Sequence, residues 1–107
     1  MANSGDISRY LVNLQKEFDG AFLYEALADA EKQPKMAELY RRLAASEVKH
    51  AAAWENRLTD AGIKIPTYKP SGRARILGAL AKRFGSQFVL PTITGNEQAD
   101  SRAYDNQ

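Results

Sequence analysis

The sequence predicts an all-α fold, built on an antiparallel helical hairpin that further helices follow. Along two long segments, about 6–32 and 34–60, apolar residues recur at three- and four-residue spacing, which is typical of amphipathic helices. Only a short link at Gln33 and Pro34 separates the two segments, and proline suits the first turn of a new helix. A link this short makes the two helices an antiparallel pair.

The first helix is predicted to begin at about Asp6, a plausible N-cap, and to end at about Lys32. Phe22, Leu23 and Leu27 widen its apolar surface beyond a single stripe, so we expect this helix to have contacts on two sides. The stripe itself consists of Ile7, Tyr10, Leu11, Leu14, Phe18, Ala21, Tyr24 and Ala28.

The second helix is predicted to run from about Pro34 to Asp60 and to stop at Ala61 and Gly62. Two polar residues, Glu47 and His50, interrupt its apolar stripe. The members of the stripe that we expect to be buried are Met36, Leu39, Tyr40, Leu43, Glu47, His50, Ala51, Trp54 and Leu58.

The remainder of the chain is predicted to hold a loop and two shorter helices. Proline and glycine are frequent over 62–72, which indicates a loop, and a short basic amphipathic helix follows from Arg73 to Phe84. A final helix is expected from about Thr92 to Gln107. We therefore predict one domain over 1–107, with a core hairpin at about 6–61, the loop, and C-terminal helices over 73–107. The last helical pattern stops without a C-cap signal, so we expect the chain to be a piece of a longer protein.

Composition excludes several classes of site. The chain has 107 residues, enough for one small domain, and no cysteine, so disulfides, iron–sulfur clusters, cysteine zinc fingers and thiol catalysis are excluded. Its first residues are polar with no apolar signal core, and we expect a cytoplasmic location. The net charge is +2, but no Asp or Glu occurs between Gly62 and Asn96. Because one segment alone is basic, nucleic acid is not an expected partner.

The basic helix has two interpretations. The one we favour at this point is an ordinary packing helix with a charged outer side. The other is attachment to an anionic membrane surface or docking beside a membrane domain.

One group of residues has the side chains and the spacing of a metal site. Glu47 and His50 lie one helical turn apart, and Glu17 precedes Glu47 by thirty positions, at a similar distance from the hairpin turn. A Glu-x-x-His step alone is weak evidence, because such pairs also occur on solvated helix faces. A carboxylate within an apolar stripe is costly unless it is compensated, however, and here both helices carry one. We therefore predict that Glu17, Glu47 and His50 are metal ligands.

Two carboxylates and an imidazole suit iron or manganese, and zinc could occupy the same ligands. These three ligands make half of a carboxylate-bridged two-metal site, so a second chain is expected to complete it. Tyr24, seven residues after Glu17, is either a core aromatic or a hydrogen-bond donor to a metal-bound carboxylate. Glu97 is a further candidate ligand, because Glu97 and Tyr104 repeat the spacing of Glu17 and Tyr24.

With these residues, the chain resembles the ferritin-like, rubrerythrin-related di-iron proteins. The spacing of Glu17, Tyr24, Glu47 and His50 is similar to that of encapsulated ferritins. The segments Phe88–Pro91 and Glu97–Asp105 look more like the N-terminal ferritin-like domain of proteins fused to a vacuolar-type iron transporter. The resemblance implies a four-helix bundle, completed here by dimerisation, with homodimers or larger homo-oligomers and a membrane iron-transporter domain as expected partners.

Three functions follow, in order of preference. The first is a di-iron centre at a dimer interface that oxidises Fe(II) to Fe(III) in iron homeostasis or detoxification, with Glu17, Glu47 and His50 as its active residues. The second is a non-catalytic iron-capture or sensing domain that regulates an attached membrane transporter, which would make the protein membrane-associated. The third is a helical adaptor domain with no metal.

Overall fold

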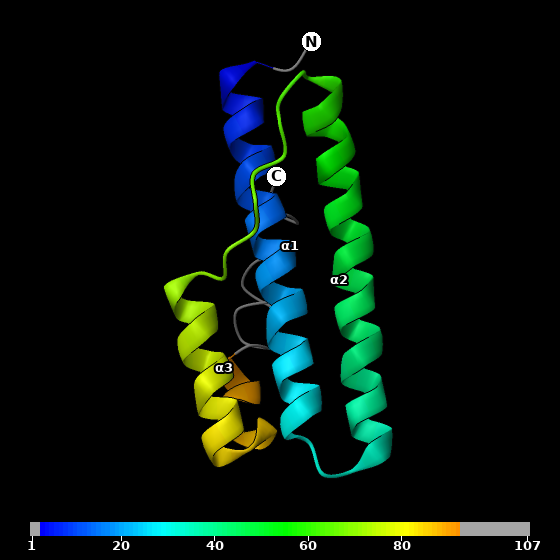
Figure 1. The fold of residues 1–107 in the computed structure, drawn as a ribbon, viewed down its shortest axis with the longest axis vertical. Helices are drawn as coiled ribbons and strands as arrows, with labels where there is room; N and C mark the ends of the chain where they lie inside the picture. The colour runs from blue at the N-terminus through cyan, green and yellow to red at the C-terminus, as the bar shows by residue number, and fades with distance from the viewer. Residues whose placement is uncertain (1–2, 93–107) are drawn as a thin grey trace.

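The computed structural model describes residues 3–92, and in this range every regular element is helical. Helix α1 spans Ser4–Ala30, α2 spans Pro34–Asp60 and α3 spans Gly72–Phe84, while residues 86–92 are also helical. The predicted all-α fold is confirmed. Figure 1 shows α1 and α2 side by side as a long hairpin, with α3 lying along the opposite flank of α1.

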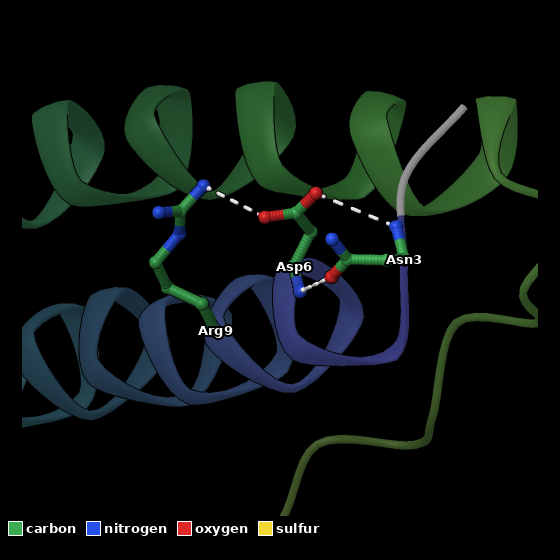
Figure 2. Close-up of polar contacts among 3 residues, drawn as sticks. All are labelled: Asn3, Asp6 and Arg9. Atoms are coloured by element: carbon green, nitrogen blue, oxygen red, sulfur yellow. Dashed lines mark hydrogen bonds and ion pairs between the residues drawn. The ribbon is translucent and has the colours of Figure 1, made fainter.

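Helix α1 begins three residues earlier than predicted, because its N-cap is Asn3 and not Asp6. The Asn3 side-chain oxygen accepts a hydrogen bond of 2.8 Å from the Asp6 backbone N–H, and the Asp6 carboxylate accepts one of 3.4 Å from the Asn3 N–H. Arg9 adds an ion pair of 3.4 Å to the same carboxylate (Figure 2). Asp6 therefore belongs to the first turn, where its negative charge also favours the positive end of the helix dipole.

The hairpin turn lies where the sequence predicts it. Helix α1 ends at Ala30, two residues before the expected position, and α2 starts with Pro34 at its first turn. The Glu31 carboxylate organises the turn by accepting 3.1 Å and 2.7 Å hydrogen bonds from the Gln33 N–H and from the Ser86 hydroxyl. At the far end, α2 stops at Asp60, as predicted, and the positive φ of 77° at Gly62 allows the chain to turn back.

Helix α1 has contacts on two sides, as its wide apolar surface predicts. It packs against α2 along one side and against α3 along another. Two apolar clusters result, one beside the hairpin turn and α3, and one near the open end of the hairpin. The buried members of the first are Leu23, Tyr24, Leu27, Ala28, Tyr40, Ala44, Ala74, Leu77, Ala81 and Val89, and those of the second are Leu14, Ala51 and Leu58.

The segment between α2 and α3 is fixed to α1 by hydrogen bonds to Asp19 and by one of 2.9 Å from the Gln15 side-chain amide to the Lys69 carbonyl. Asp19 accepts hydrogen bonds from the Tyr68 hydroxyl at 2.8 Å, from the Gln15 side-chain amide at 3.0 Å and from the Ser71 backbone N–H at 3.2 Å. The Tyr68 ring also packs against Phe18, with ring centroids 5.1 Å apart. Ser71 then caps α3 by accepting a hydrogen bond from the Ala74 N–H, so this helix starts one residue earlier than predicted.

One part of the predicted core is wrong. Leu39 and Leu43 belong to the apolar stripe of α2, yet their exposed fractions are 45% and 36%. The contact with α1 runs instead through Tyr40 and Ala44, each one residue further along α2 and so about 100° around the helix. Because α3 lies on the far flank of α1, it leaves the side of α2 that carries the two leucines open.

Candidate metal centre

The predicted metal ligands come together in the structure. Glu17 lies on α1, while Glu47 and His50 lie one turn apart on α2. Each of these residues offers one ligand atom, and the three atoms all lie within 4.8 Å of one another. The antiparallel hairpin brings them to the same height because Glu17 and Glu47 are at similar distances from the turn.

The imidazole lies between the two carboxylates. His50 Nδ1 is 3.5 Å from an oxygen of Glu17 and 3.8 Å from an oxygen of Glu47. Two anionic carboxylates this close repel one another unless a cation lies between them. A protonated imidazole supplies one such charge, and a divalent cation would supply two.

The site lies at the edge of the helix contact and not within it. The side chains of Glu17 and Glu47 are 22% and 21% exposed, whereas that of His50 is 59% exposed. The expectation that all three ligands are buried is therefore wrong for His50. The next residue, Ala51, lies in the centre of the contact with 0% exposure, and one residue along a helix turns His50 about 100° away from it.

A glycine on α1 makes room for one of the carboxylates. A Cβ placed on Gly20 would lie 3.3 Å from both Cγ and Cδ of Glu47, so the Glu47 side chain lies directly over the α1 backbone. Such a close approach is possible because Gly20 has no side chain. Gly20 is also the signal by which this contact could have been found in the sequence, since glycine inside a helix costs about 1 kcal/mol relative to alanine and so needs a reason.

The two other predicted site residues, Tyr24 and Glu97, are not among the three side chains that come together. Tyr24 is 6% exposed and belongs to the apolar cluster beside the hairpin turn. This position agrees with the core interpretation, and its role toward the metal ligands stays a prediction. Glu97 and the predicted C-terminal helix lie outside the described residues.

The donor atoms fit a divalent transition metal. Carboxylate and imidazole ligands bind such ions at about 2 Å, so two of them on opposite sides of an ion are about 4 Å apart. The separations from His50 are 3.5 and 3.8 Å, and all three ligand atoms lie within 4.8 Å of one another, so small rotamer changes of Glu17 and Glu47 are sufficient to fit an ion. Three protein ligands leave coordination positions open for water, for an oxidant or for further ligands.

An antiparallel helical hairpin with two carboxylates and a Glu-x-x-His imidazole facing one another defines the ferritin-like class of metal proteins. The family model of rubrerythrin matches residues 11–75, a range that covers more than half of the chain and includes all three predicted ligands. The chain therefore belongs to the rubrerythrin family, and this membership implies iron binding. Neither a curated protein nor a solved structure matches the chain significantly.

Membrane-spanning elements are a separate question. Within residues 3–92, none of the helices is both long enough and apolar enough to cross a bilayer.

Proposed function

We propose that two copies of the chain pair their hairpins and together hold two iron ions, which the protein oxidises from Fe(II) to Fe(III). The single observation that carries the proposal is the arrangement of the ligands. Three ligand atoms lie within 4.8 Å of one another, and the imidazole among them is on an open side of the hairpin. This is half of a two-iron site, and its open side allows a second half to approach.

The surface around His50 supports pairing. Leu39 and Leu43 lie on the same side of α2 as His50, within about 40° around the helix axis, and both are exposed. An exposed apolar strip next to an incomplete set of ligands favours a contact that buries both. In the paired form, four helices surround the ligands, which is the usual arrangement of carboxylate-bridged sites.

Each ligand has a distinct role in this proposal. Glu17, Glu47 and His50 would hold the ions, with Glu47 as the carboxylate that would serve both and Glu17 and His50 as ligands that would each serve one. When bound, iron supplies the electrons, one from each Fe(II), that reduce dioxygen or peroxide. The two carboxylates of each chain lower the net positive charge of the site, and their hard oxygen atoms favour the Fe(III) product.

The first test is a titration of the purified chain with Fe(II) in the absence of oxygen. We expect binding to saturate at about one iron per chain, since two chains share two ions, and we expect dimers at saturation. Air is then admitted, and oxidation of many equivalents per site distinguishes a catalyst from a sensor that stops after about one.

Two variants make the test specific. Glu47→Ala should abolish saturable binding and rapid oxidation while leaving the helical circular dichroism intact. Glu38→Ala is the matched control, because Glu38 is an exposed carboxylate of the same helix that pairs with Arg42 at 2.8 Å and not with the site. Unchanged oxidation in Glu47→Ala would refute the proposed mechanism, and absence of saturable binding in the parent protein would favour an adaptor domain.

A further inference from the structure

Helix α3 has one side buried and one side open. Its buried side, which includes Ala74 and Ala81 at 1% exposure and Leu77 at 9%, packs against α1. Figure 1 shows α3 on the flank of α1 that faces away from α2. The outer side of α3 is therefore remote from the contact that carries the metal ligands.

Large apolar side chains are exposed on α3 and on the helical stretch that follows it. Ile76 is 63% exposed, Phe84 is 58% exposed, and Phe88 in the following helical stretch is 59% exposed. The rings of Phe84 and Phe88 are in contact, with centroids 5.0 Å apart, so they form a continuous apolar surface. Exposed aromatic residues in contact with one another are unusual on a surface that faces only water. We call Ile76, Phe84 and Phe88 the apolar patch.

The segment that carries the apolar patch is basic, although one acidic side chain of the hairpin turn, Glu31, lies 2.7 Å from the Ser86 hydroxyl beside it. The Arg83 guanidinium stacks on the Phe84 ring at 5.9 Å from its centroid. No acidic residue occurs between Gly62 and Asn96, whereas six Lys and Arg residues do. Two of these, Arg75 and Lys82, line a pocket with Glu25 and Asp29 of α1. Arg83 is the cation that the structure places in contact with the apolar patch.

We infer that the outer side of α3 and Phe88 bind the surface of an anionic lipid bilayer. Exposed aromatic and aliphatic side chains insert between lipid headgroups, while neighbouring Arg and Lys residues pair with anionic headgroups, and this surface has both features. A second copy of the chain fits less well, because a two-fold pairing of the patch would bring the same cations face to face. A nucleic acid would use the cations and leave the insertion of Ile76 and Phe84 without a role.

The candidate metal site and the apolar patch lie on different sides of the hairpin, so both can be occupied at the same time. Because α3 lies on the flank of α1 away from α2, the chain can lie on a bilayer through the patch while a second chain covers His50 and α2. This inference does not depend on iron binding.

The test is co-sedimentation of the full chain with large vesicles of phosphatidylcholine alone or of phosphatidylcholine with about one-third phosphatidylserine. Binding is expected only to the vesicles with phosphatidylserine and should weaken as salt is added, because salt screens headgroup charge. Phe84→Ser should weaken binding about ten-fold through the loss of apolar insertion. Arg83→Gln should weaken it about five-fold through the loss of one charge.

Val48→Ser is the matched control, because Val48 is 51% exposed on α2 and lies outside the patch. It should bind vesicles as the parent does. Equal binding to neutral and anionic vesicles, absence of binding, or unchanged binding of Phe84→Ser and of Phe88→Ser would each overturn the inference. If the parent protein does not bind vesicles and light scattering shows that Phe84→Ser dissociates an oligomer, the inference is overturned and the apolar patch contacts a second copy of the chain instead.

Discussion

A substitution at Gly20 should change the affinity for metal while leaving the free energy of unfolding nearly unchanged. Replacing it by alanine places a methyl group 3.3 Å from two carbons of the Glu47 side chain and 3.5 Å from its Oε2. Ordinary carbon–carbon contacts lie at about 3.5–4.0 Å, so the Glu47 carboxylate must withdraw from α1 by about 0.3–0.5 Å. Glu17, on the same helix as Gly20, does not follow this movement.

The free energies of the two effects have opposite signs. Alanine within a helix is about 1 kcal/mol more favourable than glycine, whereas a strained Glu47 rotamer costs about 0.5–1.5 kcal/mol. The free energy of unfolding of the metal-free protein should therefore change by less than about 1 kcal/mol. Metal ligands tolerate errors of about 0.2 Å in position, so a larger displacement should lower the affinity for metal about ten-fold.

The assay compares the two quantities in one set of proteins. Urea denaturation gives the free energy of unfolding without metal, and calorimetric titration with Mn(II) gives the affinity. Gly78→Ala is the matched control, because its Cβ would lie 3.1 Å from Cε1 of Phe22, at the contact of α1 with α3. The same two opposing effects act on the stability of that variant, and because it does not touch Glu47 it should keep the metal affinity of the parent protein.

If Gly20→Ala binds Mn(II) as tightly as the parent protein does, the link between Gly20 and the position of Glu47 is refuted. Loss of affinity in both glycine variants, in proportion to lost stability, would refute it as well, since the effect would then be global. A parent protein that binds no metal would count against the proposed function and leave the packing of Gly20 against Glu47 untouched.

Two further predictions concern the contacts that hold the loop and the hairpin turn. Tyr68→Phe removes the 2.8 Å hydrogen bond to Asp19 and should lower the free energy of unfolding by about 1 kcal/mol in urea denaturation. Burial raises the pKa of Tyr68, and the hydrogen bond to Asp19 raises it further. The contribution of Tyr68 to the free energy of unfolding is therefore complete below the ordinary pKa of 10.0 and is lost as the pH rises above that value. The Phe variant should lack that alkaline loss, and an unchanged alkaline profile would contradict this. For Glu31, the hydrogen bond from Ser86 lowers the pKa, so its stabilisation is present above the ordinary value of 4.5 and is lost as the pH falls through the folded-state pKa. Thermal melts of Ser86→Ala between about pH 6 and pH 3 should therefore depend less on pH than those of the parent, and equal slopes would show that the contact contributes nothing.

Local patterns were sufficient to predict the helices. The three- and four-residue apolar spacing and Pro34 placed the boundaries of α2 correctly, because both signals depend on residues close together in sequence. The start of α1 was missed because Asn3 and Asp6 are both good caps. Their spacing allows a reciprocal pair of hydrogen bonds, and in that arrangement the first residue is the cap.

Features that depend on distant segments could not be predicted in the same way. The periodicity of α2 placed Leu39, Leu43 and His50 on one stripe, but it does not show which part of the stripe another segment covers. Asp19 was not singled out, because two of its hydrogen-bond donors, Tyr68 and Ser71, are about fifty residues away in the chain. The sequence was sufficient to predict that Glu17, Glu47 and His50 lie close together, as they do in the structure. Their role in binding metal stays a prediction.

The distribution of the ligands between the helices has a consequence for the hairpin. The spacing of Glu47 and His50 depends on α2 alone, whereas the 3.5 Å from His50 to Glu17 depends on how far α1 and α2 are shifted along their common axis. Small residues such as Ala44 and Ala51 line the contact together with large ones such as Leu14, Tyr40 and Leu58. A slip of one turn moves a ligand by about 5.4 Å, too far for one ion to bind all three. A metal bound to all three residues would therefore favour the same alignment of α1 and α2 that their packing and the short turn between them specify.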